Sequence, residues 1–368
     1  MSRQVKIGLI GCGSISEAYF AGCKRYDILS LTACADLDFA RAQAKAEKHG
    51  VRACTVDDLL ADPDIEIIIN LTIPQAHAEV NEAVLRAGKH AYTEKPFALD
   101  SREGARVLAL ARKKKLLVGC APDTFLGGGL QTARKALDDG LIGRPVAAMA
   151  FMLCRGHERW HPAPEFYYKK GGGPMFDMAP YYLTALINLL GPVARVTGSA
   201  KISFPKRTIT SQPLAGTKIT VDVPTHYAGV ADFADGTVAN LVMSFDAWPG
   251  PVLPRIVIYG TEGTLEVPDP NIFGGDVRLT RLGNKESELI APTHSITRGR
   301  GTGVADMAYS ILRRKRAHRV NGELANHVVE AMEAFERSSV TGRHVKLKST
   351  CKRPAALPTG LPDGALDP

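Results

Sequence analysis

The run VKIGLIGCGSIS (residues 5–16) constrains what this chain can fold into more than any other stretch. A short apolar strand pattern runs directly into two glycines, a helix-like stretch follows to about Arg25, and LTACAD (31–36) has the pattern of a second strand. Gly11 permits a tight turn, and Gly13 lets the backbone approach a pyrophosphate at the start of the helix. The run therefore predicts a strand-helix-strand unit that binds a dinucleotide.

The kind of dinucleotide is indicated by residues around this fingerprint. Ser16, at the third position of the G-x-G-x-x-G/A pattern, is small enough for the helix to pack on the strand. Asp36 lies 20 residues further on, where a carboxylate accepts the ribose hydroxyls of NAD and repels the 2′-phosphate of NADP. Arg41 nearby would attract such a phosphate. We expect NAD, with NADP as the second choice, and assign the loop residues Ser14 and Ile15 to the cofactor site.

Strand-like and helix-like stretches then alternate as far as residue 121. They are IEIIINL (65–71), a helix at 75–88, HAYT (90–93), a helix at about 102–114 and LLVGCA (116–121). Such alternation predicts right-handed crossovers and a doubly wound parallel sheet, the Rossmann fold. Ligands of such sheets bind beyond the carboxyl ends of the strands. Those ends carry Gly11, Asp36, Thr72, Pro74, Glu94, Lys95 and Asp123, which we therefore place in the cofactor site.

The second part of the chain has a different pattern. A helix-like stretch at 128–143 is followed by a region rich in strands, in which Asp235-Gly236 and Glu262-Gly263 have the spacing of tight hairpin turns. Hairpins predict antiparallel pairing. We therefore expect an α/β protein with a Rossmann domain (1–122), a C-terminal α/β domain built on a large, mostly antiparallel open sheet (123–350), and an extended arm (351–368).

Composition and charge exclude several classes of protein. The 368 residues have a net charge of +8, but the basic runs at 112–115 and 313–316 each end a helix-like stretch, where cations suit the helix dipole. We expect no nucleic-acid partner. No apolar run approaches the ~20 residues that span a bilayer, and no signal-peptide pattern is present at the start. The seven scattered cysteines suggest a reducing compartment. We expect a cytoplasmic protein without a membrane partner.

Several motifs resemble one known family. LRAGKH followed by YTEKPFALD (92–100), NLTIPQAHAE (70–79), the glycine fingerprint and GGGPMFDMAPYY (171–182) are similar to the glucose–fructose oxidoreductase / inositol dehydrogenase family (Gfo/Idh/MocA). The resemblance covers nearly the whole chain. It implies oxidation or reduction of sugars, polyols or their acids with NAD(P), and assembly of the chains into a dimer or tetramer through the C-terminal sheet.

The resemblance also implies roles for particular residues. Lys95 matches the lysine that binds the reacting hydroxyl or takes part in proton transfer, and Glu94 and Pro96 position it. His77, with Thr72 and Pro74, matches a segment that runs beside the nicotinamide. A lysine at a strand end beside a cofactor crevice is also well placed on chemical grounds, because oxidation of a carbinol needs a base for the hydroxyl proton.

The GGGPMFDMAPYY segment departs from the family pattern G-G-G-x-x-x-D-x-G-x-H-x-x-D. Asp177 matches the aspartate, but Ala179, Tyr181 and Thr184 replace the glycine, the histidine and the last aspartate. The usual imidazole is therefore missing from its place. We expect Asp177 to accept hydrogen bonds from sugar hydroxyls, with Tyr181 one helical turn away. The alternative is a helix N-cap, which Pro180 weakens because it has no amide hydrogen.

Tyr181 needs help to act as an acid or base. The unperturbed pKa of a tyrosine is about 10, so a cation such as Lys95 or the oxidised nicotinamide would have to lower it. We expect Lys95, Asp177 and Tyr181 to be catalytic, with a purely structural Tyr181 as the alternative. Tyr182 is placed among the substrate-binding residues.

The segment CRGHERWHPAPEFYYKK (154–170) predicts a loop that closes over the substrate. Trp160 would stack on a sugar ring, and His157 or His161 would reach its polar groups or supply the missing acid/base. Their spacing of four residues suggests a metal, but Pro162 and Pro164 oppose a regular helix and no third ligand stands out, so we expect none. The cations of this segment would favour an anionic sugar.

Together these patterns predict an NAD-dependent oxidoreductase that transfers a hydride between a sugar, glycoside or polyol hydroxyl and a nicotinamide. The main alternative is an NAD-dependent glycosidase, which oxidises a ring hydroxyl transiently, eliminates the aglycone and returns the hydride. A third possibility is a dinucleotide-binding sensor without catalysis, against which the retention of Lys95 and Asp177 argues.

Overall fold

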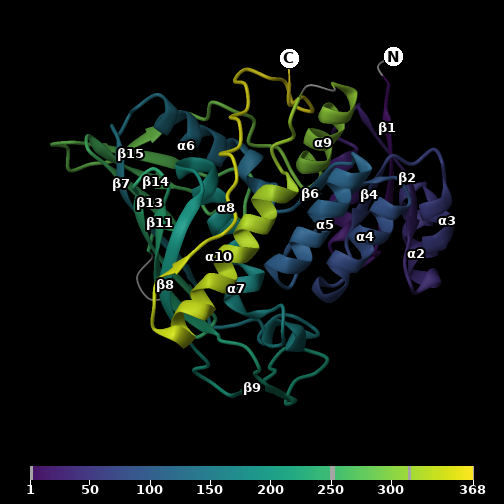
Figure 1. Ribbon diagram of the computed structural model, residues 1–368, viewed down its shortest axis with the longest axis horizontal. Coiled ribbons are helices and arrows are strands. Elements are labelled where there is room, and N and C mark those ends of the chain that lie inside the picture. The colour runs from purple at the N-terminus through teal and green to yellow at the C-terminus, as the bar shows by residue number, and fades with distance from the viewer. Residues whose placement is uncertain (1–2, 249–252, 314–315, 368) are drawn as a thin grey trace.

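The computed structural model describes residues 3–248, 253–313 and 316–367. In this part of the chain the strands form a six-stranded sheet, a nine-stranded sheet and a two-stranded ribbon. The six-stranded sheet comes from the N-terminal third and lies on the right of Figure 1, and the nine-stranded sheet lies on the left. The predicted pairing of a Rossmann sheet with a large, mostly antiparallel sheet is confirmed.

The six-stranded sheet is parallel throughout and has the strand order β3-β2-β1-β4-β5-β6. Its strands are β1 (Val5–Ile10), β2 (Leu29–Ala35), β3 (Arg52–Ala53), β4 (Ile67–Asn70), β5 (His90–Thr93) and β6 (Val118–Cys120). Its helices are α1 (Ser16–Cys23), α2 (Phe39–His49), α3 (Val56–Ala61), α4 (His77–Arg86) and α5 (Ser101–Lys114). The order reverses between β1 and β4, so the carboxyl ends of these strands are the place where such sheets bind ligands.

Local sequence explains the ends of these elements. All four residues of β4 are buried, as expected for a strand covered by helices on both faces. Asp100 starts α5 by accepting hydrogen bonds from the amides of Arg102 and Glu103. The last turn of α5 carries Arg112 and two lysines, which stabilise the negative end of the helix dipole as the charge pattern predicts.

The nine-stranded sheet has the order β16-β15-β14-β13-β7-β12-β11-β8-β17, and only the β7–β12 pair is parallel. Its strands are β7 (Pro145–Leu153), β8 (Val193–Lys201), β11 (His226–Phe233), β12 (Val238–Ser244), β13 (Ile256–Gly260), β14 (Gly263–Val267), β15 (Val277–Arg281), β16 (Glu288–Ile290) and β17 (Val345–Lys346). The predicted hairpin turns join β11 to β12 and β13 to β14. Assembly through this sheet stays a prediction.

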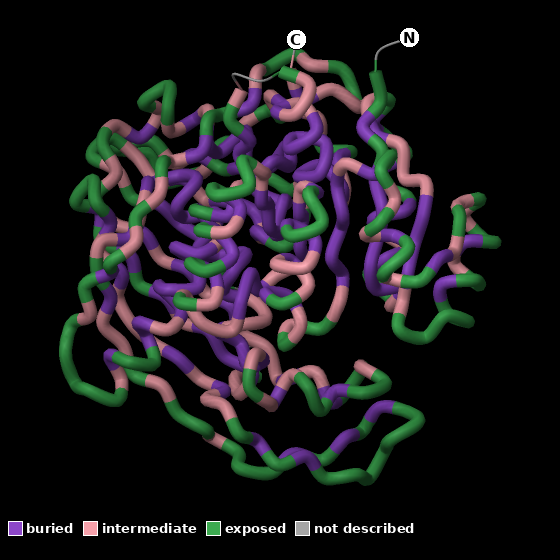
Figure 2. Tube along the Cα trace, turned by 45° about the vertical axis from the view of Figure 1, so that its right-hand side comes forward, coloured by how far each residue is buried: buried purple, intermediate pink, exposed green. Residues whose placement is uncertain are grey.

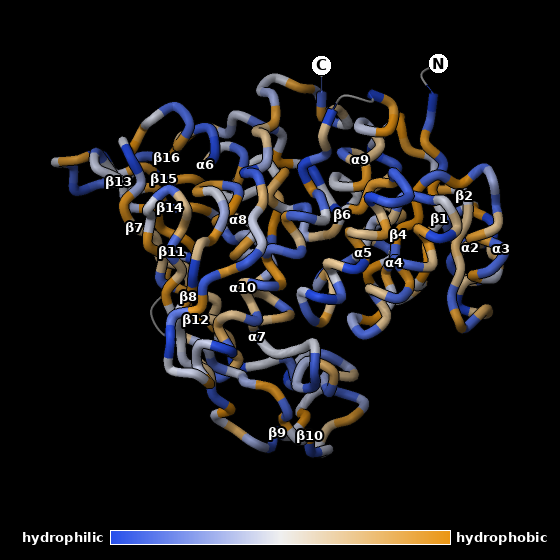
Figure 3. The backbone as a smooth tube through the Cα atoms, in the orientation of Figure 1, coloured by the Kyte–Doolittle hydropathy of each residue, from blue (hydrophilic) through white to orange (hydrophobic). Residues whose placement is uncertain are grey.

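Three helices cover the nine-stranded sheet, and one of them also joins it to the Rossmann domain. Helices α6 (Gly128–Asp138), α8 (Ala179–Leu190) and α10 (Gly322–Thr341) pack on the nine-stranded sheet, and α10 also contacts α5 and β6. Every residue of α8 is buried, because the helix lies between the sheet and its two neighbours. Buried residues gather in this central region in Figure 2, and hydrophobic residues concentrate in the strands in Figure 3. The C-terminal domain is thereby fixed against the Rossmann domain.

A largely exposed ribbon, β9 (Lys206–Thr208) with β10 (Lys218–Thr220), extends from the lower end of the molecule in Figure 1. The segment 154–170 packs beside it and contains a short 3-10 helix, η3 (Pro164–Tyr168). Buried Arg207 holds this segment: its guanidinium pairs with Glu158 at 2.7 Å and with Asp246. Glu158 also accepts a hydrogen bond from the Tyr168 hydroxyl.

The C-terminal arm packs on the body of the protein. Residues 351–367 contain neither helix nor strand, and Leu357 and Leu366 are buried. Asp367 pairs with Arg316, which follows α9 (Thr302–Leu312) and also pairs with buried Asp306 at 2.5 Å. Part of the 313–316 basic run lies outside the described residues, but Arg316 is held in ion pairs rather than solvated. No helix within the described ranges is long and apolar enough to cross a membrane.

Removal of the Arg207 charge is expected to destabilise the fold. Arg207→Met leaves Glu158 and Asp246 buried without their cation, which costs about 3–5 kcal/mol of unfolding free energy. Arg195→Met is the matched control, because Arg195 pairs with Asp232 on the exposed surface and such pairs contribute about 0–1 kcal/mol. Urea denaturation measures both; equal losses would contradict a special role for Arg207.

Candidate active site

The glycine loop between β1 and α1 has the shape of a phosphate cradle. Gly11 has a φ of +98°, and a Cβ atom there would lie 2.6 Å from the carbonyl oxygen of Leu71, so only glycine fits. A Cβ at Gly13 would meet nothing within 4 Å, which leaves the backbone open to a ligand. The Ser16 hydroxyl donates to the Gly13 carbonyl at 2.6 Å. A glycine or alanine at this position would only leave room for the helix to pack on the strand. The serine is also small, and its hydroxyl stabilises the loop in addition.

Asp36 lies at the end of β2, beside this loop. Its carboxylate accepts hydrogen bonds from the amides of Cys12 at 2.7 Å and Asp38 at 2.9 Å, and the Arg41 guanidinium lies 3.7 Å away. Asp36, Arg41 and the glycines line a cavity of about 930 Å³. An open glycine loop at a helix start, followed by a carboxylate at the next strand end, fits the pyrophosphate and ribose of a dinucleotide.

A second cavity, of about 860 Å³, continues from the first. The residues that both cavities share are Gly13, Leu71, Thr72 and Ile73. The second cavity is also lined by Ser14, Ile15, Pro74, His77, Glu94, Lys95, Asp177 and Tyr181. Apart from Asp123, the predicted cofactor residues therefore lie along one continuous surface, which ends at the predicted catalytic residues.

Lys95 is fixed at the end of β5 by its neighbours. The Lys95–Pro96 peptide bond is cis, and the carbonyl oxygen of Pro96 lies 2.6 Å from Nδ1 of buried His77. The other ring nitrogen of His77 lies 3.0 Å from the carbonyl oxygen of Thr72. Glu94 accepts hydrogen bonds from the Tyr19 hydroxyl and from the Lys95 amide, both at 2.9 Å. His77 and Glu94 therefore position the lysine.

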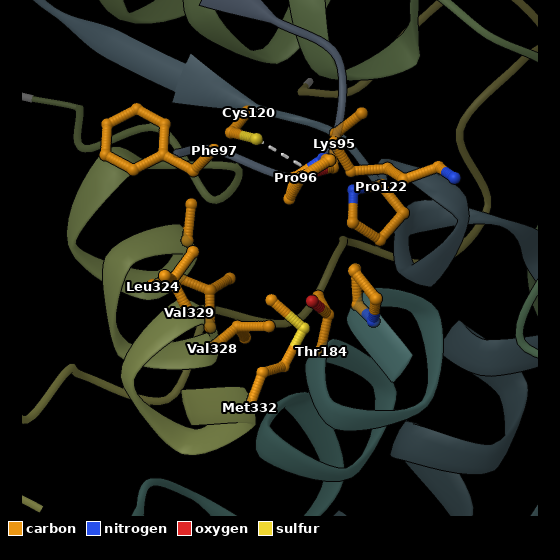
Figure 4. Close-up of a pocket in the computed structure, with 13 residues that line it drawn as sticks. Lys95, Pro96, Phe97, Cys120, Pro122, Thr184, Leu324, Val328, Val329 and Met332 are labelled. Atoms are coloured by element: carbon orange, nitrogen blue, oxygen red, sulfur yellow. Dashed lines mark hydrogen bonds between the residues drawn. The ribbon is translucent and has the colours of Figure 1, made fainter. Parts of the chain in front are cut away.

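The face of this segment away from the second cavity is packed against α10. Leu324, Val328 and Met332 of α10 face Pro96 and Pro122 across a cavity of only about 10 Å³ (Figure 4). Such a space holds at most one water molecule, so no substrate binds there. Its apolar lining instead supports the backbone that carries Lys95.

Lys95, Asp177 and His157 form the centre of the site. The Lys95 ammonium donates to Oδ1 and to the carbonyl oxygen of Asp177, at 2.7 and 2.8 Å. Oδ2 of Asp177 lies 3.2 Å from Nε2 of His157. The three side chains come from the end of β5, from the last residue of α7 (Gly173–Asp177), and from the loop after β7. The site is thus built across both domains.

Electrostatics fix the charges of this cluster. Burial works against a charged Asp177, but Lys95 and His157 outweigh it and lower the pKa of Asp177 to about 2. Burial also works against a charged Lys95, but the negative charge of Asp177 outweighs it and raises the pKa of Lys95 above its usual value. Near neutral pH the pair is therefore an ammonium and a carboxylate.

His157 is held in one tautomer. The indole N–H of Trp160 donates to Nδ1 of His157 at 3.2 Å, so Nδ1 carries the lone pair. Nε2 then carries the hydrogen and donates it to Asp177. The only lone pair of the ring is therefore covered by Trp160, which is itself 61% exposed and able to move.

The structure corrects the expected role of Tyr181. Asp177 ends α7 and Ala179 begins α8, so Asp177 and Tyr181 do not share one continuous helix, and Asp177 caps neither. The Tyr181 hydroxyl accepts a hydrogen bond from Arg300 at 2.9 Å. Burial raises the pKa of Tyr181 despite the opposing charges of Lys95 and Arg300. The lowered pKa that an acid/base role at Tyr181 required is therefore absent.

Two other assignments were wrong in position. Asp123 is fully buried and lines neither large cavity; its carboxylate accepts from the amides of Gly301 and Gly303 at the start of α9 and pairs with Arg300 at 3.3 Å. Tyr182 is also buried, with its hydroxyl 3.3 Å from the Phe151 carbonyl oxygen. We expected both in the site because residues next to them in the sequence belong to it. The turn after the strand and the helix instead direct both side chains into the core.

The 154–170 loop differs from expectation in detail. Trp160 and His161 are not among the residues that line the cavity, and His161 accepts a hydrogen bond from the Ala163 amide. Lys169 does line it but pairs with Asp222 at 2.9 Å, which removes a cation expected for an anionic sugar. Within the described ranges, no group of three or more histidines, cysteines and acids is arranged to hold a metal ion.

Sequence reasoning missed Arg300 and an aromatic wall. Arg300 lies 119 residues after Tyr181, and no motif connects them. The aromatic residues Phe166 and Tyr167, together with Phe176, line the second cavity. The EFYY run was the available signal, but its orientation depends on the packing of η3 against the ribbon.

The fold and site define a dinucleotide-binding oxidoreductase. Comparison with family models gives two matches: residues 5–121 match the oxidoreductase family with an NAD-binding Rossmann fold, and residues 130–266 match the GFO/IDH/MocA C-terminal domain. The chain belongs to the Gfo/Idh/MocA family of oxidoreductases. Its N-terminal domain is thus an NAD(P)-binding domain, as the resemblance implied.

Curated relatives include sugar and polyol enzymes. The chain is 25% identical over 266 residues to 1,5-anhydro-D-fructose reductase from Ensifer adhaerens, covering 70% of this chain and 74% of that protein. It is 32% identical over 206 residues to inositol 2-dehydrogenase from Rhizobium meliloti (strain 1021), covering 55% of this chain and 60% of that protein. The second match thus spans less than two thirds of its relative's length.

Solved structures share the fold along nearly the whole chain. Levoglucosan dehydrogenase in complex with NADH has a TM-score of 0.81 at 19% identity, covering 94% of this chain and 100% of that one. Aldose–aldose oxidoreductase from Caulobacter crescentus, complexed with glycerol, has a TM-score of 0.78 at 21% identity with the same coverage. At these identities the likeness establishes the fold.

The cofactor site makes a prediction about selectivity. Asp36→Asn keeps an oxygen for the Cys12 amide but removes the charge that repels a 2′-phosphate, so the ratio of NADPH to NADH affinity should rise about tenfold, or ~1.4 kcal/mol. Adding Arg41→Ala should cancel much of this gain. Fluorescence titration with both reduced cofactors measures it; an unchanged ratio in Asp36→Asn would contradict the assignment.

Proposed function

We propose that this protein is an NAD-dependent dehydrogenase that oxidises a hydroxyl group of a sugar, glycoside or polyol. The observation that carries the proposal is the Lys95–Asp177–His157 cluster: Lys95 and Asp177 line the cavity that continues from the glycine loop, and His157 contacts Asp177 without itself lining the cavity. The names of the curated relatives, which include inositol 2-dehydrogenase and D-xylose dehydrogenase, support this class of substrate.

Lys95 orients and polarises the reacting hydroxyl. Two of its three N–H groups are committed to Asp177, and the third is available to donate to a substrate oxygen in the cavity. The bound nicotinamide would supply the hydride acceptor next to Thr72 and Pro74. As the hydroxyl proton leaves, the fixed positive charge of Lys95 stabilises the developing negative charge on the oxygen.

His157 takes the hydroxyl proton. Lys95 and Tyr181 are protonated near neutral pH, and Asp177 with a pKa of about 2 is a weak base. Nδ1 of His157 carries the remaining lone pair of the cluster. The imidazolium that forms when it takes the proton is stabilised by Asp177, whose Oδ2 lies 3.2 Å from Nε2 of His157. The Trp160 indole leaves Nδ1 when the substrate enters. His157 thus replaces, from a different loop, the imidazole absent from position 181.

The NAD-dependent glycosidase is the second candidate, favoured by one observation. Tyr181 lines the cavity and its hydroxyl accepts a hydrogen bond from Arg300, which leaves the hydroxyl hydrogen available for a hydrogen bond to the oxygen of a departing aglycone. Steady NADH accumulation with product supports the dehydrogenase. Aglycone release without NADH accumulation supports the glycosidase, and NAD binding without any turnover supports a sensor.

His157→Gln should lower kcat by about 10²–10⁴-fold while KM stays within a few fold, because only proton transfer is lost. NADH formation is followed on a panel of sugars, methyl glycosides and inositols. The matched control is His344→Asn, an exposed histidine outside the site, which should leave kcat unchanged. Near-wild-type turnover in His157→Gln would refute the assignment.

The pH dependence gives an independent test. Asp177 has a pKa of about 2 and the pKa of Lys95 is raised, so neither changes charge between about pH 4 and 9. The charges of this pair should therefore cause no change in kcat/KM within this range. A limb within it that His157→Gln retains but Asp177→Asn or Lys95→Met removes would contradict these fixed charges.

A further inference from the structure

An aromatic wall connects the catalytic cluster to the mouth of the cavity. Phe166 and Tyr167 of η3 and Phe176 of α7 all line the 860 Å³ cavity. The ring centroids of Phe166 and Tyr167 are 4.1 Å apart, and those of Tyr167 and His157 are 4.3 Å apart. The wall therefore runs from Tyr167, whose ring packs against His157, to Phe166.

The outer end of this wall is exposed. Phe166 is 45% exposed although it lines a cavity, and its ring centroid lies 4.1 Å from that of Tyr167. A large aromatic group left open on a concave surface beside a second ring indicates a binding site, because its burial by a ligand is favourable.

The charged residues that line the cavity either belong to the reaction centre or are paired with other charged residues. Among the described residues that line it, Glu94, Lys95 and Asp177 belong to the cluster around the reacting hydroxyl, and the other charged residues are Glu165 and Lys169. Those two pair with each other at 3.6 Å, and Lys169 also pairs with Asp222 at 2.9 Å. The aromatic wall thus offers an anionic group no uncommitted cation, but it offers an apolar ring a surface to stack on.

We propose that the substrate is a glycoside with an aromatic aglycone, which packs against Phe166, Tyr167 and Phe176 while a hydroxyl of its sugar contacts Lys95. This inference rests on the proposed function. The cavity also takes the nicotinamide, but Phe166, Tyr167 and Phe176 are not among the residues assigned to the cofactor, so the part of the cavity that they line is left for the substrate. Offset or edge-to-face ring contacts with Phe166 and Tyr167 add to the area that the aglycone buries.

The test compares phenyl and methyl glycosides of the same sugar. Matched β-glycosides of glucose, galactose, xylose and glucuronic acid are assayed with NAD for both NADH formation and phenol release. For the sugar that is turned over, kcat/KM of the phenyl glycoside should exceed that of the methyl glycoside by about tenfold or more, because the phenyl ring buries more apolar area and packs against the aromatic wall. Phe166→Ala should reduce this ratio several-fold, because it removes the outer of the three rings that contact the aglycone while Tyr167 and Phe176 remain.

Controls separate this inference from the proposed function. Trp248→Ala removes an exposed aromatic residue that is not part of the cavity and should leave the ratio unchanged. Equal kcat/KM for phenyl and methyl glycosides in the wild type, or an unchanged ratio in Phe166→Ala, overturns the aromatic site and leaves the dehydrogenase intact. If neither these glycosides nor the sugars and inositols of the activity panel are turned over, the proposed function fails. Calorimetric binding of the phenyl glycosides to the NAD-bound enzyme then decides: binding that Phe166→Ala weakens supports the aromatic site, and absence of binding overturns it.

Discussion

The ion pair between Lys95 and Asp177 is the interaction on which the site depends. Lys95 comes from the end of a strand of the Rossmann sheet, and Asp177 from the C-terminal domain, so the contact of 2.7 Å joins the two domains at the reacting position. Buried charges require partners, and this pair satisfies that requirement on both sides of the interface. Helix α10 packs against both sheets and so fixes the segments that carry Lys95 and Asp177 relative to each other.

This pair also determines what the neighbouring groups can do. Because Lys95 stays cationic and Asp177 stays anionic, neither is a good proton acceptor, and the acid/base work passes to a third residue. His157 meets Asp177 from a loop that the buried Arg207–Glu158 pair holds in place. Arg300, fixed by Asp123, holds the hydroxyl of the tyrosine that occupies the usual histidine position. The tyrosine at position 181 is therefore held by Arg300, which is itself held by Asp123.

Much of the fold and part of the site followed from local sequence. The glycine loop, Asp36 and the strand ends are set by backbone geometry close in sequence, and five of the six strands of the Rossmann sheet were predicted to within about two residues, whereas the short β3 was not. Asp123 and Tyr182 could not be placed in this way, because which side of a turn or helix faces the core is decided by tertiary packing. Arg300 could not be predicted as a site residue because its partners Tyr181 and Asp123 are far from it in sequence. Similarly, only the fold brings His157 within 3.2 Å of Asp177 and leaves His161 outside the cavity.

The most direct measurement of the central claim is a double-mutant cycle on kcat with Lys95→Met and Asp177→Asn. If the two residues act as one unit, each single variant loses most of the activity and the double variant is no worse than the poorer single variant, within about threefold, because groups that act together are strongly non-additive. The stability of all three variants is measured in parallel. Losses that multiply in the double variant would show that Lys95 and Asp177 act independently, and would contradict the account.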